Sequence, residues 1–101
     1  MDIRQSKNGN HAVLSLGGRF DFNAHREFKG AYSALLADSS INSIAVNLSA
    51  VAYLDSSALG MLLIFRERAQ AANKQISLSQ PNPTVVKILD IANFHKIFTI
   101  S

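Results

Sequence analysis

The sequence predicts a single α/β domain over residues 1–101, with a mixed, mainly parallel β-sheet, an antiparallel hairpin at its N-terminal edge, and helices packed on it. The length suits one domain. From residue 11 onward, strand-like segments alternate with segments of helical periodicity, and this order implies crossover connections between parallel strands. Before that alternation, the turn signal "KNGNH" predicts a hairpin between two neighbouring strands.

The first half of the chain supplies this hairpin and one helix. A strand near residues 2–6 is followed by a second over residues 11–18, where apolar and polar side chains alternate. We expect Gly17 and Gly18 to end the second strand. A helix is predicted over residues 21–37 because its apolar residues recur at helical spacing: Phe28, Tyr32, Leu35 and Leu36.

The second half of the chain continues the alternation. Residues 43–51 are rich in β-branched side chains and poor in charge, which predicts a central strand covered on both faces. The later elements are, in order, a helix at 58–73, a strand at 74–80, a helix at 82–93 and a short strand at 96–101. For the last helix, Asn82 is the expected cap and Pro83 lies in the first turn.

Composition excludes several classes of function. The formal net charge is +3, but the ten Lys and Arg residues are scattered, so no nucleic-acid partner is expected. There is no cysteine and the three histidines lack ligand spacing, so we expect neither a metal nor a cofactor. The polar start is no secretory signal and the longest apolar run is too short for membrane insertion, which makes the cytoplasm the expected location.

The stretch "VAYLDSSALGMLL" interrupts the most hydrophobic region with Asp55, Ser56 and Ser57. These residues either cap the following helix or form a site beyond the carboxyl end of a strand, where functional sites of open α/β sheets lie. The stretch lacks the first glycine of a nucleophile elbow, and no histidine has a recognisable context, so we do not expect an enzyme. A phosphoserine at a helix start would be tolerated by the fold and would present a new charge outside.

The motifs resemble those of the STAS domain, and specifically of the bacterial anti-sigma factor antagonists. The resemblance rests on "VNLSAVAYLDSSALGMLL", on "LGGRFDFNAH", which places Asp21 at the acidic position of the family, and on the closing "NPTVVKILDIANFHKIFTI". Two features depart from the family pattern. Ala58 stands where glycine is common, and the sequence stops soon after Phe98, where many members carry another helix.

This resemblance implies a partner switch. The unmodified antagonist would bind an anti-sigma factor, often itself a serine kinase, and phosphorylation of Ser56 would release it; Ser57 is the alternative site. A metal-dependent serine phosphatase would reverse the modification, and the partner is either a separate kinase or a response regulator carrying such modules. The chain would be a monomer or a weak homodimer. The alternative function is a structural STAS subunit of a lipid-transport or other multiprotein complex, never phosphorylated.

Candidate partner contacts surround the serine: Asp21, Asp55, Ser57, Met61 and Ile64. Asp21 either caps the first helix, contacts a partner, or does both. Met61 and Ile64 are expected in the core, because a helix that is apolar all round is usually buried; if exposed, they would form a patch beside Ser56. Phe20 and Phe22, which flank Asp21, belong either to the core or to the rim.

Overall fold

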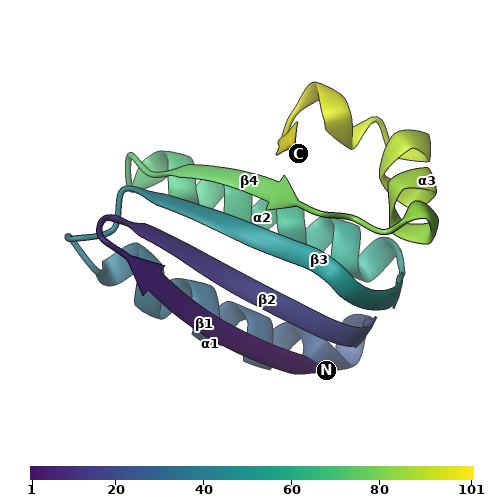
Figure 1. Cartoon of the computed structure of the whole chain (residues 1–101), viewed down its shortest axis with the longest axis horizontal. Coiled ribbons are helices and arrows are strands. Elements are labelled where there is room, and N and C mark those ends of the chain that lie inside the picture. Colours follow the sequence, from purple (N-terminus) through teal and green to yellow (C-terminus); the bar gives the residue numbers. More distant parts are fainter.

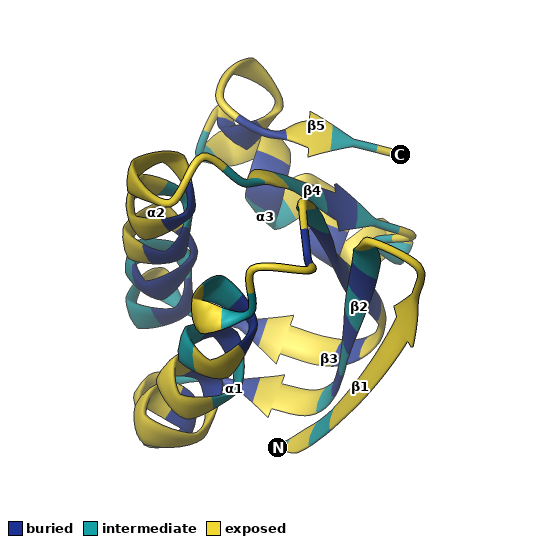
Figure 2. Cartoon of the chain, turned by 90° about the vertical axis from the view of Figure 1, so that its left-hand side faces the viewer, coloured by how far each residue is buried: buried dark blue, intermediate teal, exposed yellow.

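The computed structural model describes all 101 residues, which form one α/β domain with a five-stranded sheet in the order β1-β2-β3-β4-β5 (Figure 1). Helices α1 and α2 lie side by side against one face of the sheet (Figure 2). The elements are β1 (Asp2–Asn8), β2 (His11–Phe20), the 3-10 turn η1 (Phe22–Ala24), α1 (His25–Ala37), β3 (Ser43–Leu54), α2 (Ser56–Ala71), β4 (Gln75–Ser79), α3 (Pro83–Ile91), the 3-10 turn η2 (Phe94–Lys96) and β5 (Thr99–Ile100). The predicted fold class is confirmed.

The N-terminal hairpin and the parallel strands are also as predicted. Strand β1 pairs with β2 in antiparallel fashion, and Asn8 lies opposite His11 across a two-residue turn. Gly9 in that turn has a φ of 63°, a conformation that glycine adopts without steric cost. Strands β2, β3, β4 and β5 pair in parallel.

The expectation that Gly17 and Gly18 end the second strand is wrong. Strand β2 continues to Phe20 and stays paired with β3 through register shifts on both sides of the glycines. Gly18 has a φ of 87°, so the irregularity is absorbed by a residue without a side chain while pairing resumes beyond it. The longer strand carries Phe20 to the carboxyl edge of the sheet, next to Leu54.

The expectation that the central strand is covered on both faces is also wrong. Ile44, Val46 and Leu48 on one face of β3 are fully buried within a single hydrophobic core. On the alternating face Ala45 is buried, but Ser43 and Asn47 are only partly buried, because α1 and α2 pack on the opposite face. Small polar side chains let this second face of the sheet meet water.

The other elements differ from their predictions mainly at their ends. The segment predicted as one helix at 21–37 is divided into η1 and α1. Helix α3 begins as predicted, with the side chain of Asn82 accepting a hydrogen bond from the Val85 amide at 3.1 Å. The last strand is shorter than expected, because Phe94–Lys96 form the turn η2 and β5 holds two residues.

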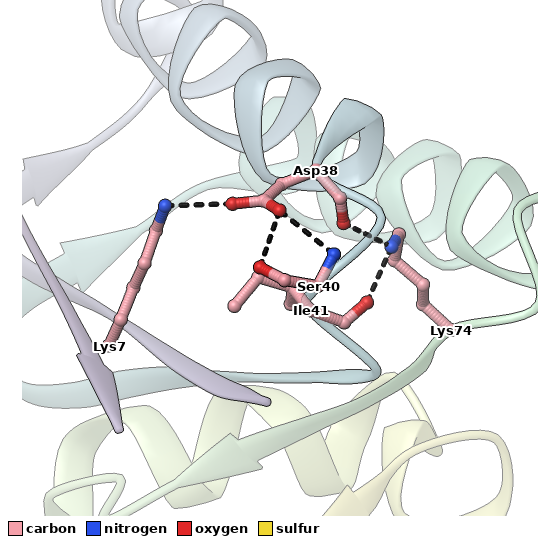
Figure 3. Close-up of polar contacts among 5 residues, drawn as sticks. All are labelled: Lys7, Asp38, Ser40, Ile41 and Lys74. Atoms are coloured by element: carbon pink, nitrogen blue, oxygen red, sulfur yellow. Dashed lines mark hydrogen bonds and ion pairs between the residues drawn. The ribbon is translucent and has the colours of Figure 1, made fainter. Parts of the chain in front are cut away.

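A polar cluster ties the loop after α1 to strand β1 and to the loop that precedes β4 (Figure 3). Lys7 donates to the Asp38 carboxylate at 2.8 Å, and both the amide and the hydroxyl of Ser40 donate to the same carboxylate. Lys74 donates to the backbone carbonyls of Asp38 and Ile41. The hydrogen bonds from Lys7 and Ser40 hold the pKa of Asp38 well below its usual range. This cluster lies where the parallel strands start, at the edge of the sheet away from Ser56.

Candidate functional site

The candidate site is built on two strand ends that lie next to each other. Phe20 and Leu54 are paired as the last residues of β2 and β3, and the Asp55 amide donates to the Phe20 carbonyl at 3.3 Å. The next residue of each chain segment is an aspartate, so the parallel pairing brings Asp21 and Asp55 to the same edge of the sheet.

Asp55 caps helix α2. Its Oδ1 accepts a hydrogen bond from the Ala58 amide at 2.9 Å, which satisfies one of the free N–H groups at the helix start. Ser56 is the first residue of the helix and its side chain is exposed, while Ser57 is partly buried. The helix was predicted from residue 58 and begins two residues earlier, so Ser56 lies at the helix start as expected. Among the three polar residues, the capping role falls to Asp55 alone.

Asp21 also caps its own element. Its Oδ1 accepts from the Asn23 amide at 3.0 Å, and its Oδ2 lies 3.7 Å from Nε of the exposed Arg19. This confirms the capping interpretation for Asp21, although the element that it caps is the turn η1 and not the helix α1. A contact with a partner is compatible with this geometry and remains a prediction.

Met61 and Ile64 have different surroundings. Met61 is buried, as expected, whereas the core expectation for Ile64 is wrong because its side chain is 43% exposed. The buried residues of α2 lie on the stripe that faces the sheet and α1, and Ile64 lies outside that stripe. Both residues nevertheless border a small hollow between α1 and α2, together with His25.

Two exposed aromatic side chains near the site were not identified as functional from the sequence. Phe20 is buried in the core, whereas Phe22 is 71% exposed. Tyr53 is 42% exposed, and the guanidinium of Arg19, its register partner on β2, lies 5.3 Å from the ring centroid. Arg19 and Tyr53 become neighbours only through strand register, so no local sequence signal joins them.

The structure contains no group of three His, Cys, Asp or Glu side chains suited to a metal ion. A histidine–serine hydrogen bond joins His11 Nδ1 and Ser43 Oγ at 2.7 Å, but Ser43 starts β3 and Ser56 follows its end. None of the helices combines the length and the apolar character that a membrane span requires. What the site does offer is an exposed hydroxyl at a rigid helix start.

Comparison with known proteins places the chain in a family. Residues 3–100 match a family model described as "Mlab, STAS domain". A STAS-domain containing protein of Pseudomonas aeruginosa is 45% identical over 96 residues, covering 95% of this chain and 93% of the relative. An anti-sigma F factor antagonist of Lysinibacillus sphaericus is 26% identical over 80 residues, covering 79% of this chain and 68% of the relative. The chain therefore belongs to the STAS domain family.

Solved structures show the same fold. The unphosphorylated anti-sigma factor antagonist SpoIIAA superposes with a TM-score of 0.82 at 20% identity, over 99% of this chain and 88% of that chain. The phosphorylated form of SpoIIAA from Bacillus gives a TM-score of 0.75 at 19% identity, over 99% and 91%. At these identities the likeness concerns the fold.

Proposed function

We propose that this protein is an anti-sigma factor antagonist whose binding to an anti-sigma factor is controlled by phosphorylation of Ser56. The observation that carries the proposal is the position of Ser56, exposed at the first turn of α2 directly beyond the end of a central strand. The relative from Lysinibacillus is an anti-sigma F factor antagonist, and the SpoIIAA fold exists in both phosphorylated and unphosphorylated forms.

Physical chemistry supports a switch that leaves the fold intact. Asp55 already supplies the helix cap, so modification of the Ser56 hydroxyl removes no capping bond. A phosphate adds about −1.5 to −2 charge at a helix start, where the dipole favours anions. A docked partner would have to desolvate that charge, and a penalty of about 1.4 kcal/mol already changes affinity tenfold.

The proposed partner is an anti-sigma factor that is also the serine kinase, with a metal-dependent serine phosphatase as the opposing enzyme, either alone or within a response regulator. The surface of this chain that would contact the partner includes four exposed or partly exposed residues around Ser56: Asp21, Asp55, Ser57 and Ile64. Met61 is left out of this surface because its side chain is buried.

The experiment compares three immobilised variants, Ser56→Ala, Ser56→Asp and Ser57→Ala, as baits in lysate of the source organism. We expect Ser56→Ala to retain a partner that Ser56→Asp loses, and the purified partner to phosphorylate the wild type and Ser57→Ala but not Ser56→Ala. Peptide mass spectrometry then locates the phosphate. Phosphate on Ser57 would move the site by one residue. Equal binding by Ser56→Ala and Ser56→Asp, with neither serine phosphorylated in cells, would refute the switch.

A second candidate function is a STAS subunit of a lipid-transport or other multiprotein complex that is never phosphorylated. The observation in its favour is that the matching family model is described by the name Mlab and not by the anti-sigma function. Constitutive co-purification with a membrane transporter, unchanged by Ser56→Asp, would favour this second function over the first.

A further inference from the structure

Phe22 and Ser56 occupy equivalent positions on adjacent strand ends. Each follows an aspartate cap, and the two caps follow the paired residues Phe20 and Leu54. Parallel pairing therefore brings Phe22 to the same edge of the sheet as Ser56, although the two residues are far apart in sequence. Phe22 is 71% exposed, and a large aromatic side chain in water beside a candidate regulatory serine calls for a physical explanation.

The backbone that carries Phe22 is well fixed. Asp21 accepts hydrogen bonds from the Asn23 amide on its carboxylate and from the Ala24 amide on its carbonyl, both at 3.0 Å. The Phe22 ring also stacks on His25, with centroids 6.5 Å apart and an interplanar angle of 20°. A partner that buries this ring would therefore lose little conformational entropy in doing so, which is the property of a good interface anchor.

Phe22 is linked through His25 to a small hollow between α1 and α2. His25, on which Phe22 stacks, borders the same hollow as the exposed Ile64, and Met61 forms part of its wall. The exposed Phe22 ring thus lies next to His25 at the border of a small hollow between the two helices, which Lys29 also lines. Interfaces commonly centre on such an aromatic residue and surround it with weaker contacts.

We infer that Phe22 is the apolar anchor of the anti-sigma partner, with His25 and Ile64 at its flank, and that it supplies affinity independently of the phosphorylation state of Ser56. The inference rests on the proposed function. Its occupant is the anti-sigma factor and not a second copy of this chain, because Phe22 and Ser56 follow paired strand ends and so lie at the same edge of the sheet, where the charge on Ser56 must reach the partner. In this scheme Phe22 supplies binding affinity for the partner, and the phosphorylation state of Ser56 determines whether the partner remains bound.

The test uses the purified partner that Ser56→Ala retains and Ser56→Asp loses. Its affinity is measured for the wild type, Phe22→Ala, Phe22→Leu and the double variant Phe22→Ala with Ser56→Asp. Ile91→Ala is the matched control, because Ile91 is 84% exposed and ends α3, which lies near the end of β4, away from α1 (Figure 1). All single variants should melt like the wild type, since the truncated side chains are exposed.

We expect Phe22→Ala to weaken binding at least about tenfold, Phe22→Leu to restore most of the loss, and Ile91→Ala to stay within about twofold. Phe22→Ala should also weaken the residual binding of Ser56→Asp, since the apolar contact of Phe22 does not require an uncharged Ser56. A photo-crosslinker, p-benzoylphenylalanine, placed at position 22 should capture the partner, whereas the same group at position 91 should not.

Three results would overturn the inference. If Phe22→Ala binds within about twofold of the wild type while Ser56→Asp still loses the partner, the switch stands and the anchor does not. Equal weakening by Ile91→Ala would show unspecific apolar binding. Crosslinking of position 22 to another copy of this chain would show a self-association surface. If instead Ser56→Ala and Ser56→Asp bind equally, the proposed function itself fails, and the anchor that rests on it falls too.

Discussion

Asp55 caps helix α2 and Ser56 does not, and this difference leads to a prediction about the free energy of unfolding. Asp55 accepts the capping hydrogen bond from the Ala58 amide at 2.9 Å, whereas Ser56 is an exposed residue of the first turn. Replacing a capping aspartate with alanine costs about 0.5–2 kcal/mol. A carboxylate added in the first turn by Ser56→Asp should be neutral or stabilise by about 0.3–1 kcal/mol through the helix dipole. Adjacent substitutions should thus act in opposite directions.

Urea denaturation measures this difference. For a domain of this size the slope is about 1–3 kcal/mol/M, so a loss of about 1 kcal/mol moves the Asp55→Ala midpoint down by about 0.3–1 M. Asp55→Asn is the matched control, because asparagine caps about as well as aspartate and removes only the charge. Its midpoint should therefore stay close to that of the wild type.

One result would contradict this reasoning directly. If Ser56→Asp is less stable than Asp55→Ala, the helix start is held by Ser56 and not by Asp55. A phosphate on Ser56 would then disturb the fold, and the proposed switch would have to work by local unfolding of α2 and not by charge at an intact surface. Equal slopes for all variants are the condition for comparing their midpoints as free energies.

Two further predictions concern the core and the polar cluster. Leu62→Ala should lower the free energy of unfolding, measured by urea denaturation, by about 2–5 kcal/mol, because Leu62 is fully buried. Leu63→Ala, on the solvent side of α2, should change it by no more than about 0.5 kcal/mol. Similar losses for the two variants would contradict the orientation of α2. Lys7 and Ser40 lower the pKa of Asp38 in the folded state. The Asp38 carboxylate therefore stabilises the fold above about pH 4, and this stabilisation is lost as the pH falls further. Asp38→Asn should thus lower the free energy of unfolding more at pH 7 than at pH 3. An equal loss at both pH values would show that the ionised carboxylate contributes nothing through its charge.

The features that were predicted correctly depend on residues close together in the sequence. Asn82 and Pro83 start α3 as expected, because a cap acts on amides two or three residues away. The alternation of strands and helices determined the fold class in the same way, because the periodicity of each segment reflects its own geometry. The exposed hydroxyl of Ser56 at a helix start was likewise predictable from the polar interruption between two apolar segments.

The errors concern features that depend on partners distant in the chain. Gly17 and Gly18 were predicted to end the second strand, but β2 continues to Phe20 because it pairs with β3 on both sides of the irregularity. Ile64 looked like a core residue, but the sheet and α1 cover only one stripe of α2. A secondary-structure propensity describes one residue, whereas the burial of that residue depends on which distant segments pack against it.

The sequence by itself determined the fold class and the cap of α3, because both follow from local hydrogen bonding and periodicity, while the choice of Ser56 over Ser57 came from the resemblance to the STAS family. Only the tertiary structure decided what surrounds that serine. Parallel pairing of β2 with β3 placed Asp21 and Phe22 at the same edge of the sheet as Asp55 and Ser56. Phe20 is buried whereas Phe22 is exposed, because β2 ends at Phe20 and Phe22 begins the turn η1. Strand register is a relation between distant segments of the chain, and a one-residue change in the register of β2 would have exchanged its core-facing and solvent-facing residues.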